Sequence, residues 1–377
     1  MASKKKTRFH TSESFFDYTL LCTVFFLIVF GLVMIYSTSS YQSGTTYLKQ
    51  QAFSVALGLV AMIFVARVDY HFWRKFAIPA IVVSCVLILL LLSPLGMTRN
   101  GATRWLNLGI SLQPAEVAKV GVILFLASII SKFGKSVRPM QIVVWVFVPT
   151  ALVAMLIFFI SNNLSSAIIV AGIAMAMLFV ASPDYKKFVI MALALIAVVT
   201  AYVFYVKSQS GAGGFRGTRI LAWMNPEQYA DGPGFQTLQA LYAIGSGGIF
   251  GKGLGQSMQK RGFIPEAQND MIFSVLCEEL GLCGASVVLL LFAILIWRCM
   301  IIANNAKDRF GAMLVVGVMS HLAIQVILNV AVVTNTIPNT GISLPFISYG
   351  GSSVFFLLIE IGLVLSVARN IELREMV

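Results

Sequence analysis

Phe263-Ile264-Pro265-Glu266-Ala267-Gln268-Asn269-Asp270 marks the point at which the character of this sequence changes. Before it lies a polar region that begins near Lys207, and after it an apolar segment runs from Ile272 to Ile301. An apolar segment of this length can cross the hydrocarbon core of a bilayer, which requires about 20 residues. Asp270 is therefore predicted to stand where water meets a membrane helix.

The composition of the whole chain indicates a membrane protein. Of its 377 residues, 58% are hydrophobic and 11% are charged, and the mean hydropathy is +0.88, whereas a soluble domain has about 25% charged residues. The formal net charge of +12 is explained by basic cytoplasmic loops near anionic lipid head groups, so we expect no nucleic-acid partner. The five cysteines show no metal-ligand spacing and imply no disulfide framework.

Hydropathy predicts an all-α polytopic membrane protein, one integral domain over residues 1–377, with about ten spans. The first span is too long for a removable signal peptide and is expected to remain as an anchor. The predicted spans are Tyr18–Tyr36, Phe53–Val68, Phe76–Leu92, Ala115–Ile130, Val143–Ile160, Leu164–Val180, Phe188–Val206, Ile272–Ile301, Met313–Val333 and Phe346–Val367.

Basic residues predict the orientation of these spans. Every second gap between spans is basic, and cytoplasmic loops attract Lys and Arg. Both termini are then cytoplasmic, and the loop at residues 207–271, between spans seven and eight, is extracellular. The basic positions are Lys4, Lys5, Lys6, Arg8, Arg67, Arg74, Lys75, Lys132, Lys135, Arg138, Lys186, Lys187, Arg298, Lys307, Arg309, Arg369 and Arg374.

The extracellular loop carries most of the polar motifs. Apolar spacing over Phe235–Tyr242 suits an amphipathic helix, and glycine-rich turns flank it at Gly245–Gly248 and Gly251–Gly255. Such turns let backbone N–H groups approach phosphate oxygens, although turn formation is their commoner role. Lys260 and Arg261, which follow, would suit a pyrophosphate group.

Ionisable and polar residues at membrane depth are candidates for function. Glu116 and Lys119 are spaced to share one helix face, so they form either an ion pair or part of a substrate site. Arg104 lies in an outer loop from which it could reach an anion. His321, Gln325 and Asn329 form a polar stripe on the ninth span, which interhelical hydrogen bonding would explain.

Further carboxylates lie beyond Asp270. Glu278 and Glu279 are adjacent, so at most one of them is expected to face a site, and the other to bond a neighbouring element. Glu360 in the last span has an equally good structural explanation. Asp270 has two interpretations from its position alone, because a helix N-terminus favours an anion. It is either a helix cap or a catalytic group.

At these residues the chain resembles the SEDS family (shape, elongation, division and sporulation), the polytopic peptidoglycan glycosyltransferases that include FtsW, RodA and SpoVE. The resemblance covers nearly the whole chain, and its loop sequences look more like the FtsW and SpoVE branch than RodA. It is carried by Gly101–Trp105, Leu112–Lys119, Gly234–Gln236, Ile244–Gly248, Pro265–Asp270, Glu278–Gly281 and Ser348–Ser353.

The resemblance implies polymerisation of lipid II into glycan strands on the outer face of the bacterial cytoplasmic membrane, for septal wall synthesis in cell division. Asp270 matches the essential aspartate of the family and would act as general base, with Glu266 in reserve. Substrate binding is expected at Arg104, Glu116, Lys119, Lys260, Glu266 and Ser352. A divalent cation, Mg²⁺ or Mn²⁺, would assist. Expected partners are lipid II, the growing glycan strand, a class B penicillin-binding protein and other division proteins.

The sequence departs from the family pattern at two places. Asn163 stands where an aspartate is common, so a carboxylate role there is lost or replaced by amide hydrogen bonding. Gln268 and Asn269 stand where His-Thr is common, so a role for that histidine does not carry over.

Three other functions are compatible with the sequence. A lipid II flippase would suit about ten spans with polar residues at depth, although the densest polar cluster is in an outer loop rather than at the midplane. A RodA-like elongation polymerase would share the same chemistry. A non-catalytic scaffold would explain the spans but not the carboxylate motif.

Overall fold

The computed structural model describes residues 17–371, apart from 100, 110, 134–142, 183–185, 187–189, 191–192, 194–199, 202–203 and 206–213. Within this part of the chain, eight helices are long and apolar enough to cross a membrane, and a shorter apolar helix occupies Val144–Ile160. The class predicted from hydropathy, a polytopic helical membrane protein, is confirmed. The predicted span Phe188–Val206 lies largely outside the described residues, as do several basic positions of the orientation argument, Lys4 to Arg8, Lys135, Arg138, Lys187 and Arg374.

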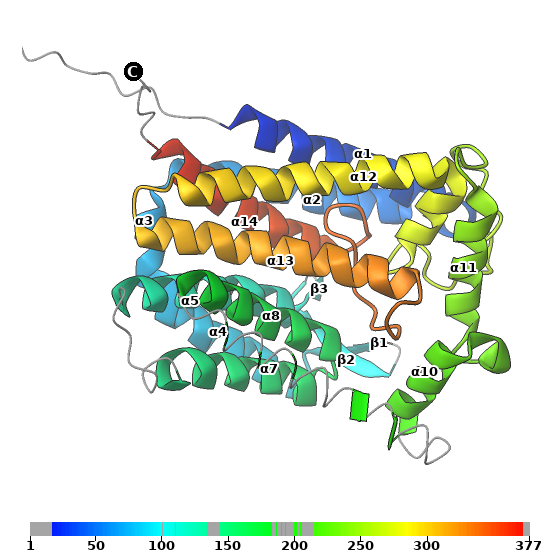
Figure 1. The fold of residues 1–377 in the computed structure, drawn as a ribbon, viewed down its shortest axis with the longest axis horizontal. Helices are drawn as coiled ribbons and strands as arrows, with labels where there is room; N and C mark the ends of the chain where they lie inside the picture. The colour runs from blue at the N-terminus through cyan, green and yellow to red at the C-terminus, as the bar shows by residue number, and fades with distance from the viewer. Residues whose placement is uncertain are drawn as a thin grey trace, which may run out of the picture.

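The helices form a bundle whose long elements run side by side (Figure 1). At its centre, α13 packs against α5, α8, α12 and α14, while α2 packs on α14 and α4 on α5. The most enclosed of these helices is α5, in which 89% of the residues of the apolar 18-residue stretch are buried. The membrane helices are α1 (Tyr18–Ser43), α2 (Thr46–Arg67), α4 (Ala77–Leu89), α5 (Pro114–Phe133), α7 (Val148–Ile160), α8 (Leu164–Ala181), α12 (Ile272–Asn304), α13 (Arg309–Val333) and α14 (Gly351–Arg369).

The ends of several helices differ from the hydropathy prediction. α1 extends two turns past Tyr36, and the span predicted from Phe76 is preceded by the short α3 (Tyr70–Trp73) and a 3-10 turn, Arg74–Phe76. A second 3-10 turn, Leu90–Leu92, ends α4, and a π-helical turn, Val143–Phe147, leads into α7. The last span begins at Gly351 rather than Phe346, because Pro345 and Phe346 lie in a loop and Phe346 has a φ of 62°.

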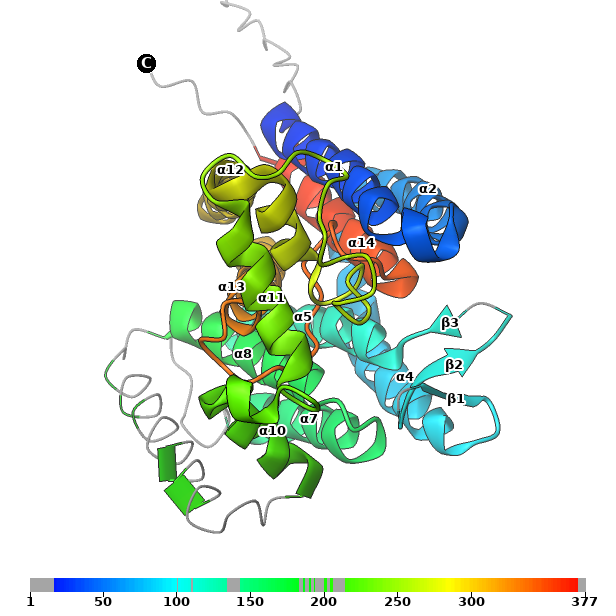
Figure 2. The ribbon, with the colours of Figure 1, turned by 90° about the vertical axis from the view of Figure 1, so that its right-hand side faces the viewer.

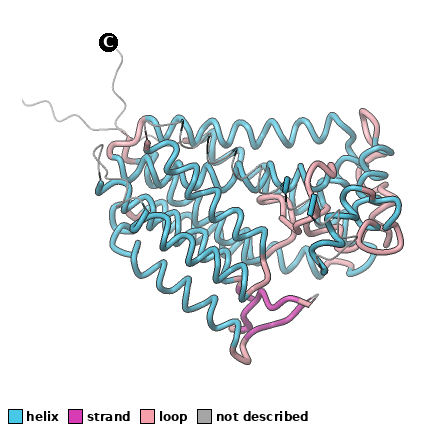
Figure 3. The backbone as a smooth tube through the Cα atoms, turned by 60° about the horizontal axis from the view of Figure 1, so that its bottom comes forward, coloured by secondary structure: helices cyan, strands magenta, loops and turns pink. Residues whose placement is uncertain are grey.

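The loops predicted to be cytoplasmic lie at one end of the bundle, and the loops predicted to be extracellular lie at the other. At one end, Arg298 forms a bidentate pair with Asp17, Tyr70 donates to Asp308 at 2.5 Å, and Arg369 donates to the carbonyl of Arg67 at 3.4 Å. We call this the basic end. The opposite end, the loop end, carries the strands and the long loops (Figure 3).

A small antiparallel sheet at the loop end was not predicted from the sequence. It consists of β1 (Gly96–Arg99), β2 (Ala102–Asn107) and β3 (Ser111–Leu112), in the order β1-β2-β3. Leu106 is its fully buried anchor. The strands are short and lie between two membrane helices, which is why hydropathy gave no signal for them.

Three short helices also lie at the loop end. α10 (Gly214–Met224) and α11 (Phe235–Gly247) run across the ends of the long helices (Figure 2), with a 3-10 turn, Pro226–Tyr229, between them. The helix predicted over Phe235–Tyr242 is confirmed, because α11 spans these residues. It packs along α12. These helices form a cover over the start of α12.

α12 is broken near its start, and the glycine-rich turns fill the break. Gly281 has a φ of 67° inside the helix. The carbonyls of Glu278 and Glu279 accept from the N–H groups of Lys252 and Gly253, each at 2.9 Å. In return Leu282 donates to the carbonyl of Gly248 at 2.9 Å. The loop thus supplies hydrogen-bond partners for the backbone groups that the kink leaves unpaired. The N–H groups of Lys252 and Gly253 in the glycine-rich turn are therefore bound to protein carbonyls.

Candidate active site

Asp270 lies half-buried at the loop end, two residues before α12 begins. The interpretation of Asp270 as the helix cap does not match the geometry, because the N-cap position is Met271 and no side-chain hydrogen bond caps the helix. The carbonyl of Asp270 accepts a hydrogen bond from Asn329 at 2.9 Å. Its carboxylate interacts with the backbone N–H groups of Asp270 and Met271 and with a side chain from another element.

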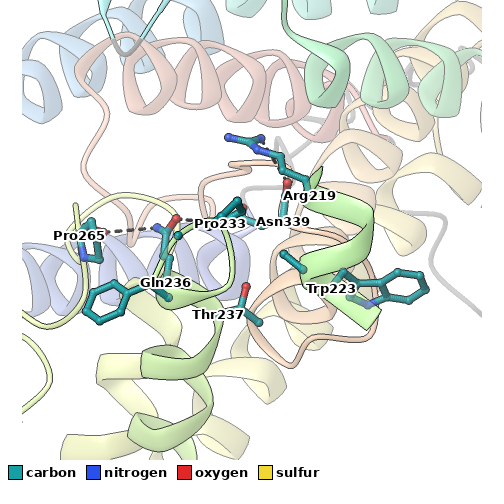
Figure 4. Close-up of a pocket in the computed structure, with 10 residues that line it drawn as sticks. Arg219, Trp223, Pro233, Gln236, Thr237, Pro265 and Asn339 are labelled. Carbon is teal, nitrogen blue, oxygen red and sulfur yellow. Dashed lines mark hydrogen bonds between the residues drawn. The ribbon is translucent and has the colours of Figure 1, made fainter. Parts of the chain in front are cut away.

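An amide network connects Asp270 to the far loop. Gln236 of α11 donates to Oδ1 of Asp270 at 3.5 Å and to the carbonyl of Pro265 at 3.4 Å. The oxygen of the same amide accepts from Nδ2 of Asn339 at 3.0 Å. Figure 4 shows Gln236 between Pro265 and Asn339. Three chain segments that are far apart in the sequence therefore meet beside the carboxylate.

Two arginines bring positive charge toward Asp270. Arg219 of α10 donates to the carbonyl of Asn339 at 3.4 Å, and Arg104 of β2 donates to the carbonyl of Asn162 at 3.2 Å. Nε of Arg104 is buried and has no partner among the described residues. Burial lowers the pKa of both guanidinium groups, and the charge of Asp270 acts in the opposite direction. The two cations and the carboxylate therefore form one electrostatic unit.

The pKa of the Asp270 carboxyl is raised to about 6. Burial is the largest cause and the nearby Glu266 also raises the pKa, whereas Arg219 and the backbone N–H groups of Asp270 and Met271 lower it. A carboxylate with this pKa is ionised at neutral pH and yet basic enough to accept a proton.

A pocket of about 350 Å³ opens beside this unit. Figure 4 shows the residues that line it, with Gln236 and Thr237 of α11 on one side and α10, which carries Arg219 and Trp223, on the other. The wall combines a cation, amides and an aromatic ring, a set suited to a polar ligand with an anionic group. It is lined by Arg219, Ala222, Trp223, Gly232, Pro233, Phe235, Gln236, Thr237, Pro265 and Asn339.

Glu116 and Lys119 contact each other. Nζ of Lys119 lies 2.7 Å from Oε1 of Glu116, and both side chains are buried near the start of α5. The second oxygen of Glu116 has no partner among the described residues. The ion pair predicted as one of two possibilities is present, and a substrate role for this pair stays a prediction.

Lys260 and Glu279 form a second buried pair. Nζ of Lys260 lies 2.7 Å from Oε1 of Glu279 and 2.9 Å from the hydroxyl of Ser37 on α1. Glu278 is also engaged, by Lys252 at 2.7 Å and by the N–H of Met258 at 3.1 Å. Both adjacent glutamates therefore bind the loop or α1, in agreement with the expectation that at most one of them would face a site.

Three remaining positions have structural contacts. Glu266 is exposed, has a φ of 49°, and accepts from Asn269 at 2.8 Å. The hydroxyl of Ser352 donates to the carbonyl of Ser111 at 2.7 Å, which ties α14 to β3. Asn163 caps α8 by accepting from the N–H of Ser166 at 3.1 Å, so its amide has a hydrogen-bonding role in place of a carboxylate.

Sequence reasoning did not select Arg219, Gln236 or Asn339 as site residues. Gln236 was visible within the motif Gly234–Gln236, and Arg219 was one of several basic residues in the loop predicted to be extracellular. No local pattern separates Arg219 from its neighbours, because its relation to Asp270 depends on how α10 crosses the bundle.

Together these observations define a polytopic helical membrane protein with a carboxylate and two arginines beside a polar pocket at one end of the bundle. The family model described as "Cell cycle protein", for FtsW, RodA and SpoVE, matches residues 18–373. The chain belongs to this family, which is the SEDS family suggested by the motifs.

Two relatives illustrate the similarity. Stage V sporulation protein E of Bacillus subtilis is 38% identical over 94% of this chain and 97% of its own length. The probable peptidoglycan glycosyltransferase FtsW of Trichlorobacter lovleyi is 37% identical over 96% of this chain and 95% of its own length.

Solved structures share the fold. A chain from a structure described as "Structural coordination of polymerization and crosslinking by a peptidoglycan synthase complex" superposes with a TM-score of 0.77 at 27% identity, over 95% of this chain and 99% of that one. The rod shape determining protein RodA of Thermus thermophilus has a TM-score of 0.67 at 25% identity, over 96% and 98%.

Proposed function

We propose that this protein is a peptidoglycan glycosyltransferase that polymerises lipid II, with Asp270 as its general base. The observation that carries the proposal is the carboxylate of Asp270, which has a pKa of about 6, is affected by the charge of Arg219, and is bonded by Gln236, a residue that lines the polar pocket. The names of the relatives support this activity, since several are called probable peptidoglycan glycosyltransferase FtsW.

The reaction follows from the groups present. The 4-hydroxyl oxygen of the acceptor sugar attacks the anomeric carbon of the donor, and the bond from that carbon to the pyrophosphate oxygen breaks. Asp270 takes the hydroxyl proton as the new glycosidic bond forms. Arg104 and Arg219, both affected by the charge of Asp270, would stabilise the negative charge that develops on the departing polyprenyl pyrophosphate.

The fold suits a lipid-linked substrate. The apolar helices would hold the polyprenyl tail in hydrocarbon, while the head group reaches the loop end. We place the loop end outside the cell and the basic end with both termini in the cytoplasm, because Arg67, Arg298 and Arg369 gather at the basic end.

Departure of pyrophosphate also suits a divalent cation, Mg²⁺ or Mn²⁺. In the part of the chain that the structure describes, no group of three or more His, Cys, Asp or Glu residues is placed to hold a metal. Mg²⁺ commonly binds through one or two carboxylates together with substrate phosphates. Glu266 is the carboxylate that would hold it, and the ion would neutralise the leaving group. The steps above do not depend on it.

We propose septal wall synthesis as the process and a class B penicillin-binding protein as partner, alongside other division proteins. The similarity to a sporulation protein and to FtsW proteins supports the division branch over RodA. The similarity to a chain from a complex described by polymerization and crosslinking supports a transpeptidase partner.

Asp270→Asn tests the catalytic role. The amide is nearly isosteric but cannot act as a base, so we expect a folded, membrane-inserted protein whose polymerisation rate is about 10²- to 10⁴-fold lower. Asp231→Asn, the same change at an exposed position of the same loop, is the matched control and should keep wild-type activity. Glu266→Gln is made alongside to test the reserve candidate. Polymer yield near wild type from Asp270→Asn would refute the assignment.

The same reconstitution separates a polymerase from a flippase. Purified protein in vesicles loaded with lipid II is assayed in parallel for glycan polymer and for movement of lipid II between leaflets. A polymerase makes polymer from lipid II already present in the outer leaflet. Translocation without polymer would favour the flippase instead.

A further inference from the structure

The polar stripe of α13 ends directly beneath the candidate active site. Asn329 is fully buried, and its Nδ2 donates to the carbonyl of Asp270 at 2.9 Å and to the carbonyl of Ile342 at 2.6 Å. Its oxygen has no partner among the described residues. One side chain therefore uses its donor group on two loops that are far apart in the sequence.

These two loops determine where the Asp270 side chain stands. The segment that ends at Asp270 is also held by the N–H of Tyr349, which donates to the carbonyl of Gln268 at 2.8 Å. On the other side, a Cβ placed on Gly341 would lie 3.7 Å from Oδ2 of Asp270. The carboxylate is thus enclosed between the loop before α12 and the loop after α13.

At the start of α12, the hydroxyl of Ser274 donates to the carbonyl of Met271 at 2.7 Å and Gln236 donates to the carboxylate of Asp270, but among the described residues only Asn329 donates a side-chain hydrogen bond to the carbonyl of Asp270. The N-cap position of α12, Met271, makes no side-chain cap hydrogen bond. A backbone carbonyl away from water needs a hydrogen-bond donor. The hydrogen bond from Asn329 supplies that donor from a different helix, one that is rigid and central in the bundle.

The neighbouring stripe residues do not make this contact. Gln325 donates to the carbonyl of Ser343 at 3.0 Å, and His321 bonds Glu360 at 2.8 Å. Both fix the α13–α14 region, as expected for buried polar residues in a membrane bundle. Asn329 differs because its partner is the backbone of Asp270.

We propose that Asn329 is a positioning residue for the reaction, which acts by fixing the backbone of Asp270 against the loop at Ile342 so that the carboxylate points into the site. The inference rests on the proposed function, since it assumes that Asp270 acts on the substrate. A displacement of about 1 Å in a reacting group can lower a rate about 100-fold.

Asn329→Leu tests the proposal, because leucine has a similar size and lacks the amide. We expect kcat for lipid II polymerisation to fall about 10- to 100-fold, with KM little changed since the arginines and the pocket stay in place. Amide hydrogen exchange should speed up within 268–271 and 341–344 and stay at wild-type values in the remaining helices. Asn329→Ser, which keeps one short donor, should lie between Leu and wild type and serves if Asn329→Leu does not fold.

Ser320→Ala is the matched control. Ser320 is a buried polar residue of the same helix whose hydroxyl donates to the carbonyl of Val316 at 2.7 Å within α13. Its loss should leave kcat and exchange at 268–271 unchanged. A folded Asn329→Leu protein with wild-type kcat, or with exchange raised evenly over the bundle, would overturn the inference.

Asp270→Asn, measured in the same assays, separates the two proposals. If Asp270→Asn polymerises lipid II normally, the proposed function of Asp270 fails, whatever Asn329 does. If Asp270→Asn is inactive and Asn329→Leu is not impaired, only the positioning role fails. The hydrogen-exchange result does not depend on activity, so it reports on the contact in either case.

Discussion

Lys119 and Glu116 form an ion pair of 2.7 Å in which both side chains are buried, one turn into α5. Removing one partner of a buried pair leaves an uncompensated charge and costs about 3–5 kcal/mol. The contact therefore complicates any test of Lys119 as a substrate ligand, because a folding defect and a binding defect would look alike.

A double variant separates the two effects. Lys119→Met should lower both thermal stability and polymerisation. Adding Glu116→Gln removes the unpaired carboxylate, so we expect stability to recover while activity stays low, as for a residue that binds the pyrophosphate. Melting temperature and lipid II polymerisation are measured on the same preparations. Full recovery of activity in the double variant would show that Lys119 acts only as an ion-pair partner.

The pH dependence of activity should follow the carboxyl of Asp270. Its pKa is raised to about 6, and a general base must be deprotonated, so kcat/KM should rise with pH up to about 6 and then level off. Arg219→Gln should move this limb to higher pH, because Arg219 lowers the pKa, and Glu266→Gln should move it to lower pH, because Glu266 raises it. A profile that is flat between about pH 5 and pH 8 would contradict the assignment.

Gly281→Ala should disrupt the start of α12. Gly281 has a φ of 67°, and an added Cβ would lie 2.4 Å from the backbone N of Gly251 and from the carbonyl of Ile249. We expect a loss of roughly 1–3 kcal/mol or more, seen as a lower melting temperature, together with reduced activity.

Gly245→Ala is the matched control for Gly281→Ala. Gly245 lies within α11, and nothing lies within 4 Å of the position that its Cβ would occupy. Alanine is favoured over glycine in a helix by up to about 1 kcal/mol. Equal losses in the two variants would show that the loop contact at Gly281 does not matter.

The proposed transpeptidase partner should bind along α12 and α13 and the extracellular loop. An apolar groove there is lined by Leu289, Val326 and Ile327, and Ile327 is 65% exposed. Ile327→Ala should reduce co-purification of a class B penicillin-binding protein from native membranes in mild detergent. Phe64→Ala, at an exposed position of α2, is the control. Absence of any transpeptidase from the wild-type preparation would count strongly against the partner.

The sequence was sufficient for those properties that depend on composition and local spacing. The membrane class follows from the apolar content, because a helix must satisfy its own backbone hydrogen bonds in hydrocarbon. The start of the span at Ile272 was predicted to the residue, while the helix ends at Asn304 rather than at Ile301. The spacing of Glu116 and Lys119 likewise predicted a pair on one face, since residues three apart are neighbours on a helix.

Asp270 was also found from the sequence, but by its match to a family motif rather than by its position. The position alone left a helix cap and a catalytic group as alternatives. The geometry that argues against the cap, with Met271 at the N-cap and Asn329 on the carbonyl of Asp270, depends on residues outside the motif.

Only the tertiary structure decided which side chains surround that carboxylate. Gln236 bonds it and the charge of Arg219 acts on it because α10 and α11 cross the end of the bundle. Lys260 is directed instead to Glu279 because the loop folds into the break at Gly281. Contacts of this kind join segments tens of residues apart, and their geometry is set by packing that no local pattern encodes. The sequence by itself determined the membrane helices and singled out the carboxylate that we propose as the general base, and the packing of loops against helices determined the environment of that carboxylate.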